Sequence, residues 1–281
     1  MTNGTNNEHL SCFNSIKIVR QLAGYTFQWR MPWDGSKNDY GWAQVLSDDL
    51  FCTWVFRTGI RNEKQNTSVE KELFNAIHER FHHTAVWWGV LSSRVGYAVQ
   101  NGFNPKSKLI SCRRPASVPA YVHERIISKP FNEREAKLMS LQNCELTSDV
   151  SQIDLASLGL LYESVGFGTQ ENYAHPGVSM DKLFGPGVFG FFALHNGELI
   201  GLARVLSDDC MCSWIAELCV KPNWQGKGVG HSLLDLVLQR FSHTPLYADA
   251  FKGQEAFFEA AGIRPQSKVV ACGRAPLKID G

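Results

Sequence analysis

The sequence predicts a mixed α/β fold made of two related domains, each a mixed, mostly antiparallel sheet flanked by helices. The chain repeats itself at a spacing of about 160 residues, with about 22 of 75 aligned positions identical. In the second copy, strand-like apolar runs alternate with helical patterns, and a hairpin in the middle disfavours a doubly wound parallel sheet. The length of 281 residues suits two domains of ordinary size.

The repeat sets the predicted domain boundaries. "GWAQVLSDDLFCTWVF" aligns with "GLARVLSDDCMCSWIA", and "NGFNPKSKLISCRRP" aligns with "AGIRPQSKVVACGRA". Between the copies, "PASVPAYVHERIISKP" is rich in turn residues and has no periodicity. We therefore predict a first domain over residues 1–115, a linker over 116–130 and a second domain over 131–281.

The elements of the second copy follow one another clearly. Glu145–Thr147 suggests a short first strand, and Ile153–Val165 carries apolar residues at helical spacing. Asn196-Gly197 between two apolar runs predicts a hairpin turn. A buried strand, a helix, another strand, a short helix and a final strand follow. They are predicted over "MCSWIAELCV", Ser232–Phe241, "PLYADA", "QEAFFEAAG" and "KVVACGRA".

Composition excludes several classes of protein. A net charge of +1 without a basic run argues against a nucleic-acid partner. The first residues are polar and no apolar stretch approaches the length of a membrane span, so we expect a soluble, cytoplasmic protein with no membrane partner. The eight cysteines are then reduced, and most are small buried apolar residues. Cys210-x-Cys212 has no second pair at zinc-ligand spacing, so no metal site is expected.

A glycine-rich loop, "VKPNWQGKGVGHSLLDL", lies between a predicted strand and a predicted helix of the second copy. Gly226, Gly228 and Gly230 leave backbone N–H groups uncovered, and the helix behind them adds unpaired donors and its positive dipole end. Lys221 and Lys227 add positive charge. The loop is therefore a candidate phosphate site, and a glycine-rich turn without a ligand is the alternative. The P-loop and dinucleotide patterns are absent.

The pattern Gln-x-x-Gly-x-Gly, within "LCVKPNWQGKGVGHSLL", resembles that of the GCN5-related N-acetyltransferase (GNAT) superfamily. "FFEAAGI" and "LYESVGFG" resemble other stretches of that family. The resemblance implies two splayed central strands, direct acetyl transfer from acetyl-CoA to an amine, and a pantetheine arm bound along a strand. It also implies a cofactor site composed of Leu218, Cys219, Val220, Gln225, Gly226, Lys227, Gly228, Val229, Gly230 and His231.

The first copy lacks these loop residues. Asn66, Ser68 and Glu70 stand at the positions of the three glycines, and a carboxylate there would repel a phosphate. In addition, only about 25 residues precede its first hairpin, too few for the helices on the acceptor side of the family. We expect the first copy to be a remnant that does not bind the cofactor, serving as scaffold, interface or lid.

Glu217 is the candidate general base, because it is the one carboxylate within the apolar strand "WIAELCV" and burial would raise its pKa. A carboxylate paired with a neighbouring arginine is the alternative interpretation. Asp249 is the reserve base. Asp208 and Asp209 recur in the first copy as Asp48 and Asp49, which favours a role in a turn.

Phe258 occupies the position at which many members of the resembled family have a proton-donating tyrosine. Tyr247 is the candidate substitute, and water is another. Tyr162, Glu163, Tyr173 and Asp249 are expected on the acceptor side. A nucleophilic role of Cys219 is disfavoured, because the family transfers acetyl directly.

The leading hypothesis is therefore an acetyl-CoA-dependent N-acetyltransferase acting on a small primary amine, as a monomer (an intramolecular pseudo-dimer) or a homodimer. Acetylation of a protein or peptide amine is a variant of this hypothesis. A coenzyme-A-binding regulatory protein without turnover is the alternative, and a purely structural module would bind no coenzyme A.

Overall fold

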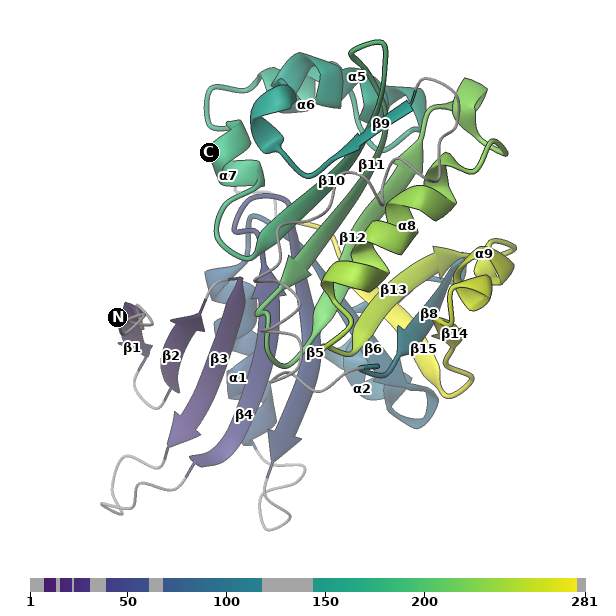
Figure 1. The fold of residues 1–281 in the computed structure, drawn as a ribbon. Coiled ribbons are helices and arrows are strands. Elements are labelled where there is room, and N and C mark those ends of the chain that lie inside the picture. The colour runs from purple at the N-terminus through teal and green to yellow at the C-terminus, as the bar shows by residue number, and fades with distance from the viewer. Residues whose placement is uncertain are drawn as a thin grey trace. The chain divides into compact units, whose positions relative to one another are not determined.

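The computed structural model covers residues 8–13, 16–21, 23–30, 39–60, 68–117 and 144–276 and divides into two compact units (Figure 1). Unit 1 comprises Met1–Ser111 with Gln266–Gly281, and unit 2 comprises Cys112–Pro265. Each unit has one mixed sheet with helices packed on it. The predicted mixed α/β fold with two sheets is confirmed.

The sheet of unit 2 has seven strands in the order β14-β8-β13-β12-β11-β10-β9. The hairpin strands β10 and β11 are antiparallel, whereas β12 and β13 are parallel. Its strands and helices are β8 (Leu109–Arg114), β9 (Cys144–Thr147), α5 (Leu155–Ser164), α6 (Gln170–Ala174), α7 (Met180–Leu183), β10 (Val188–His195), β11 (Glu198–Ser207), β12 (Ser213–Val220), α8 (Val229–Arg240), β13 (Leu246–Phe251), α9 (Glu255–Ala260) and β14 (Arg264–Pro265).

The sheet of unit 1 has eight strands in the order β1-β2-β3-β4-β5-β6-β15-β7. Its strands and helices are β1 (Glu8–Phe13), β2 (Ile16–Gln21), β3 (Gly24–Arg30), β4 (Asp39–Ser47), β5 (Cys52–Ile60), α1 (Ser68–Arg80), β6 (Ala85–Leu91), α2 (Val95–Gln100), β7 (Asn104–Pro105) and β15 (Val269–Arg274). Because β3 begins three residues after β2 ends, no helices separate them as α5, α6 and α7 separate β9 from β10. The prediction that the first copy lacks these helices is confirmed.

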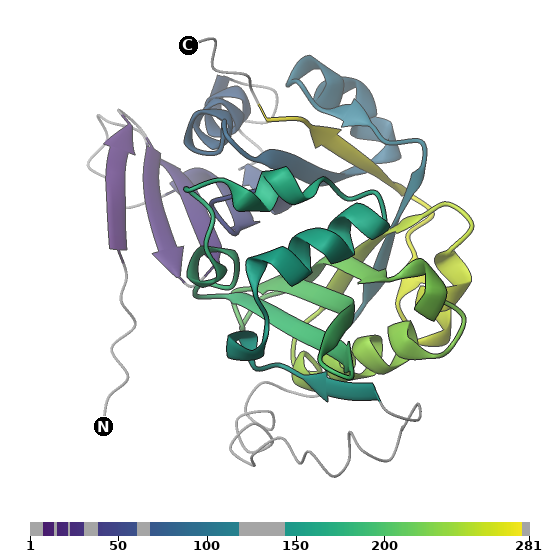
Figure 2. The same ribbon diagram turned by 90° about the horizontal axis from the view of Figure 1, so that it is seen from above.

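Helices α5 and α8 cover opposite faces of the unit 2 sheet (Figure 2). A Cβ atom added to Gly201 of β11 would lie 3.1 and 3.2 Å from side-chain atoms of α8. Arg204, three residues further along β11, interacts electrostatically with Tyr162 of α5. Residues an odd number of positions apart in a strand point to opposite faces, so the two helices sandwich the sheet.

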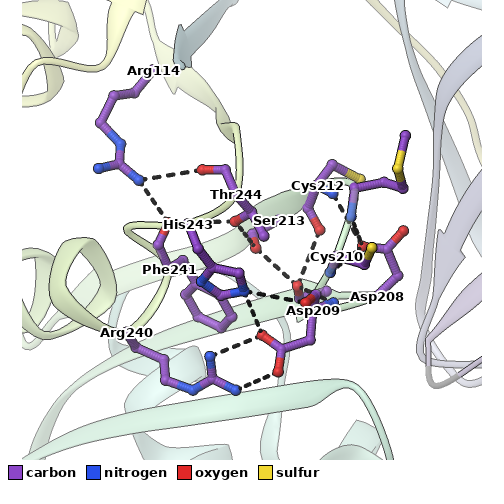
Figure 3. A network of polar contacts seen from close by, with 12 residues as sticks. Arg114, Asp208, Asp209, Cys210, Cys212, Ser213, Arg240, Phe241, His243 and Thr244 are labelled. Atoms are coloured by element: carbon purple, nitrogen blue, oxygen red, sulfur yellow. Dashed lines mark hydrogen bonds and ion pairs between the residues drawn. The ribbon is translucent and has the colours of Figure 1, made fainter. Parts of the chain in front are cut away.

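A polar network closes the turn between β11 and β12 (Figure 3), and equivalent contacts close the turn between β4 and β5 of the first copy. Asp208 accepts hydrogen bonds from the N–H groups of the turn Cys210–Cys212 at 2.8–3.1 Å, and Asp209 pairs with Arg240 at 2.8 Å. In the first copy Asp48 and Asp49 take these two roles. Asp209 and Asp49 have positive φ angles of 56° and 57°. The prediction that these aspartates serve a turn is confirmed.

The last strand of each sequence copy belongs to the sheet that the other copy mainly forms. β15 pairs antiparallel with β6 along its whole length, from Val269–Leu91 to Arg274–Val86. In the same way β8 neighbours β13 in the sheet of unit 2. The division between the units therefore falls within β8 and before β15, whereas the predicted boundary at residue 115 kept each copy contiguous. Most of the predicted linker, from residue 118 onwards, lies outside the described residues.

An arginine at the end of each exchanged strand caps a helix of the sheet that it joins. Arg114 of β8 donates a hydrogen bond to the carbonyl oxygen of Phe241, directly after α8, at 2.7 Å. Arg274 of β15 donates to the carbonyl oxygen of Phe81, directly after α1, at 2.9 Å. Each carbonyl oxygen also accepts from the N–H group of Thr84 or Thr244, so the guanidinium adds a charged donor and opposes the negative end of the helix dipole. The two exchanged strands therefore make equivalent side-chain contacts in the sheets that they join.

The stability of unit 1 is expected to fall below pH 6.5 because of His78. Burial lowers the pKa of His78, a hydrogen bond with the Asn101 carbonyl opposes this, and nearby Arg274 lowers the pKa further. Its Nδ1 atom is buried and has no partner among the described residues, so a proton added there finds no acceptor. The unfolded chain binds this proton near pH 6.5 but the folded chain only at lower pH. Stability is therefore present above pH 6.5 and is lost as the pH falls towards the folded pKa.

Replacing His78 by leucine, the residue at the equivalent position 238, should remove this loss. One proton changes the free energy of unfolding by at most about 1.4 kcal/mol per pH unit. Urea unfolding of both proteins between pH 7.5 and 5 measures the slope. His83→Leu, which changes an exposed histidine, is the control and should retain the wild-type slope. An unchanged slope in His78→Leu would contradict the assignment.

Candidate active site

The parallel strands β12 and β13 separate after a short stretch of pairing. Their register runs only from Ser213–Leu246 to Ile215–Ala248, although β12 continues to Val220. On its other side β12 stays paired with β11 as far as Val220–Gly201. The backbone groups of residues 216–220 that face β13 are thus without a strand partner among the described residues. The predicted splay of the two central strands is confirmed.

A β-bulge lies where the separation begins. Arg204 pairs with Glu217 and Val205 with Ile215, so Ala216 is the extra residue of β12. A bulge re-aims the neighbouring side chains and peptide groups. The strand therefore changes course at the point where its edge loses the β13 partner, and Glu217 is the residue next to the bulge.

The glycine-rich loop begins at the end of β12 and leads directly into α8. Gly226 and Gly228 have φ angles of 73° and 87°, a conformation in which other L-residues are strained. A Cβ atom added to either glycine would meet nothing within 4 Å. Glycine is required here by the backbone and not by crowding, and the space in front of the loop is open to a ligand.

Helix α8 begins without a side-chain cap. Its N-cap residue is Gly228, which offers no hydrogen-bonding side chain. The first N–H groups of a helix have no partner within it, and they carry its positive dipole end. The side chain of Gln225 instead donates to the carbonyl oxygen of Val220 at 2.9 Å, which ties the loop to β12. The residues present therefore fit a bound diphosphate group.

The positive charges near this loop are partly engaged. Lys227 lies 4.8 Å from the centre of the Trp224 ring, and Lys221 pairs with Glu198 at 2.6 Å. His231 is exposed in the first turn of α8, with its ring 4.7 Å from that of Phe257. Backbone N–H groups, more than lysines, are the main donors that the loop offers.

Glu217 lies on β12 at the splay and forms a bidentate ion pair. Its carboxylate oxygens lie 2.5 and 2.7 Å from Nε and Nη2 of Arg204, which is almost fully buried. The alternative considered for Glu217, a carboxylate paired with a neighbouring arginine, thus describes its contacts. The sequence analysis did not identify Arg204 as the partner of Glu217. The signal was its exchange for Gln44 in the first copy, which accompanies the exchange of Glu217 for Arg57.

Tyr162 and Tyr173 come together on the α5 face of the sheet. Their rings stack at a centroid distance of 5.0 Å, and both are nearly buried. Burial raises the pKa of Tyr162, and the negative charge of Glu217 raises it further. Tyr162 therefore lies close to Glu217. Glu163, by contrast, is exposed and accepts a hydrogen bond from Gln170 at 2.9 Å.

The two candidates on β13 lie at different positions relative to the gap. Tyr247 is opposite Trp214 in the paired part of the strands, with the Arg113 guanidinium 5.5 Å from its ring centre. Asp249 follows the last paired residue and is half-buried. Phe258 is buried in α9 against Phe257, at a ring distance of 5.1 Å, so no phenol stands at that position.

Cys219 is buried, and its thiol is held in the neutral form. Burial raises its pKa, and the charge of Glu217 raises it further. A thiolate is the nucleophilic form of cysteine, so this environment opposes covalent transfer through Cys219. The backbone of Cys219, on the splayed part of β12, is what it offers to a ligand.

The first copy keeps the splay but fills the site with its own side chains. β5 and β6 pair only as far as Val55–Trp88, the equivalent of Ile215–Ala248. Glu70, at the position of Gly230, is buried and pairs with Arg94 at 2.5 Å. The Trp42 ring covers Gly59, at the position of Cys219. Asn66 lies outside the described residues, whereas Ser68 begins α1.

Residues 158–262 match the family described as Acetyltransferase (GNAT) family. Unit 2 contains a GNAT domain. The resemblance drawn from the loop is thereby confirmed for this segment, and GNAT proteins use acetyl-CoA. The family match spans α5 to Gly262 and so includes the splay and the loop.

Solved structures similar to this chain include a GCN5-related N-acetyltransferase from Sphaerobacter thermophilus, with 14% identity over 90% of this chain and 81% of that chain and a TM-score of 0.46. A tandem GNAT protein from the clavulanic acid biosynthesis pathway has 14% identity over 92% and 84%, with a TM-score of 0.47. A conserved protein from Staphylococcus epidermidis has 10% identity over 98% and 96%, with a TM-score of 0.47. No protein of curated function matches the sequence.

Three further features concern the described part of the chain only. No helix within it is long and apolar enough to cross a membrane. No group of three or more His, Cys, Asp or Glu side chains in it could hold a metal ion. Seven of its cysteines are free thiols, namely Cys52, Cys112, Cys144, Cys210, Cys212, Cys219 and Cys272.

Proposed function

We propose that the GNAT domain is an acetyl-CoA-dependent N-acetyltransferase whose acceptor is a small primary amine. The observation that carries this proposal is the continuity of the unpaired β12 edge with an uncapped helix N-terminus through Gly226 and Gly228. In a cofactor with an amide-containing arm and a diphosphate, the arm would pair with the β12 edge and the diphosphate would meet the N-terminus of α8. Acetyl-CoA is such a molecule, and bound there it supplies an activated acetyl thioester.

The chain's own residues then bind and orient the two substrates. The N–H groups from Gly226 to His231 hold the diphosphate, and the backbone of Leu218–Val220 pairs with the arm. N–H groups at the bulge of β12 polarise the acetyl carbonyl group. Holding both reactants in one cleft removes much of the entropic barrier to their reaction.

Glu217 accepts a proton from the acceptor ammonium in this proposal. Its two bonds to Arg204 fix its position, and a carboxylate has lone pairs left to accept further hydrogen bonds. The amine nitrogen then bonds to the acetyl carbon as the carbon–sulfur bond breaks. The departing thiolate takes up one proton, so the net products are an amide, a thiol and one released proton.

The donor of that last proton is proposed to be a phenol or water, because Phe258 cannot serve. Tyr247 remains the candidate from the sequence. Tyr162 joins it, since the charge of Glu217 acts on its phenol and the two side chains therefore lie near one another. Single Tyr→Phe variants of the two separate these donors.

A coenzyme-A-binding regulatory protein is the second candidate. It is favoured by Phe258 and by the engagement of Glu217 with Arg204. Both candidates require the same loop, so cofactor binding alone does not separate them.

Calorimetry with acetyl-CoA and thiol release with a panel of amines test the proposal together. We expect micromolar binding of acetyl-CoA by the full chain and turnover with at least one amine. Binding without turnover on any amine or amino-terminal peptide would favour the regulatory protein. Absence of binding would overturn both candidates.

A further inference from the structure

Two neighbouring aromatic side chains are exposed on the acceptor side of unit 2. Phe167 is 37% exposed and Phe251 is 46% exposed, and their ring centres lie 6.3 Å apart. Large apolar side chains of the described residues are otherwise mostly buried, and these two are the aromatic exceptions. Contiguous exposed apolar surface often marks a binding site.

The backbone holds Phe167 in this exposed position. Gly166 and Gly168 on either side have φ angles of 75° and 147°, which glycine adopts without strain. The N–H group of Phe167 donates to the carbonyl oxygen of Tyr162 at 2.9 Å, which anchors the turn to α5. The Phe167 ring is therefore held at the surface by a hydrogen-bonded turn between α5 and α6.

Phe251 belongs to β13, on the other side of the splay from β12, and its ring lies next to that of Phe167. It is the last residue of β13, and its alternation with buried Ala248 and Ala250 puts it on the face that bears Tyr247 and Asp249. Its contact with Phe167 thus joins β13 to the α5–α6 turn beside the gap between β12 and β13.

Ring contacts continue inwards from this rim, through buried tyrosines, towards the proposed base. The Phe167 ring lies 6.3 Å from that of Tyr162, which stacks on Tyr173 at 5.0 Å. Tyr162 in turn interacts electrostatically with Glu217. A molecule with an apolar ring at one end and an amine at the other could bind the rim while its amine approaches the carboxylate. Aromatic faces also attract an ammonium group.

We infer that the acceptor is a small arylalkylamine, a primary amine joined by a short chain to an aromatic ring. This inference rests on the proposed acetyltransferase function and names its substrate class. Phe167 and Phe251 would contact the ring, and Tyr162 would lie beside the chain. Linear diamines and amino alcohols have no aromatic ring to contact Phe167 and Phe251.

Thiol release by the full chain at fixed acetyl-CoA tests this assignment with matched acceptors. We expect kcat/KM for 2-phenylethylamine to exceed that for ethylamine by at least about tenfold, because only the former covers the two rings. Phe251→Ala should lower kcat/KM for 2-phenylethylamine about tenfold, mainly through KM, and should change that for ethylamine less than about twofold. Met211→Ala, which removes an exposed apolar side chain from the hairpin turn, is the control and should match the wild type.

The remaining outcomes separate the failure of this inference from the failure of the proposed function. Equal or better turnover of ethylamine, putrescine or an amino-terminal peptide would overturn the arylalkylamine assignment while leaving the acetyltransferase proposal intact. If no acceptor is turned over, binding of 2-phenylethylamine to the protein saturated with coenzyme A is measured by calorimetry. Binding that is absent, or equal in Phe251→Ala, would overturn the inference. Binding that Phe251→Ala weakens would support the site even though the proposed turnover had failed.

Discussion

Replacement of Gly228 by valine is expected to weaken acetyl-CoA binding at least about 100-fold, or about 3 kcal/mol. Gly228 has a φ of 87° and is the N-cap residue of α8. A β-branched residue is strained there and would rotate the peptide groups on either side, withdrawing N–H donors from the ligand. Its side chain would also enter the open space in front of the loop. Calorimetry with acetyl-CoA measures the loss.

Gly102→Val is the matched control for backbone strain. Gly102 has a φ of 83°, and a Cβ atom added there also meets nothing within 4 Å, but it lies in unit 1 after α2. Both variants should lose similar thermal stability, whereas only Gly228→Val should lose affinity. Wild-type affinity for acetyl-CoA in Gly228→Val would contradict diphosphate binding by the glycine-rich loop. An equal loss of affinity in Gly228→Val and Gly102→Val would show that backbone strain alone causes the loss.

Replacement of Glu217 by glutamine is expected to lower kcat by about 100-fold to 10,000-fold with acetyl-CoA affinity unchanged. Glutamine keeps the size of the side chain and one acceptor for Arg204, but it cannot take up a proton at neutral pH. Turnover is followed by thiol release with the best acceptor of the panel, and cofactor affinity is followed by calorimetry.

The repeat supplies a control for this substitution as well. Arg57 occupies the position of Glu217 in the first copy, opposite Gln44. Arg57→Gln should leave kcat unchanged, because that copy has Glu70 in place of the third loop glycine. Retention of full turnover in Glu217→Gln would remove Glu217 from the mechanism and leave Asp249 as the carboxylate to examine.

The sequence predicted the elements of unit 2 and the position of the glycine-rich loop between a strand and a helix. The helix expected over Ile153–Val165 is α5, and the turn expected at Asn196-Gly197 joins β10 and β11. These features depend on neighbouring residues: apolar spacing sets a helix face, and glycine permits positive φ. Because these features depend only on residues close together in the sequence, they can be predicted from the sequence alone.

The side chains around Glu217 were predicted less well. Burial of Glu217 was inferred from its strand, but its pairing with Arg204 depends on the register of β11 and β12. The contact of Phe167 with Phe251 joins residues far apart in sequence across the splay. Neither residue carries a local pattern that distinguishes a ligand-contacting ring from a core ring.

The sequence by itself determined that the chain is a duplication and that only its second copy has a loop with the backbone freedom to hold a diphosphate. The tertiary structure alone decided which final strand completes which sheet. "SKLISCRR" and "SKVVACGR" have the same apolar pattern, so either strand suits either sheet edge. Pairing is a contact between distant segments, and only packing of the whole chain selects among partners that are locally equivalent.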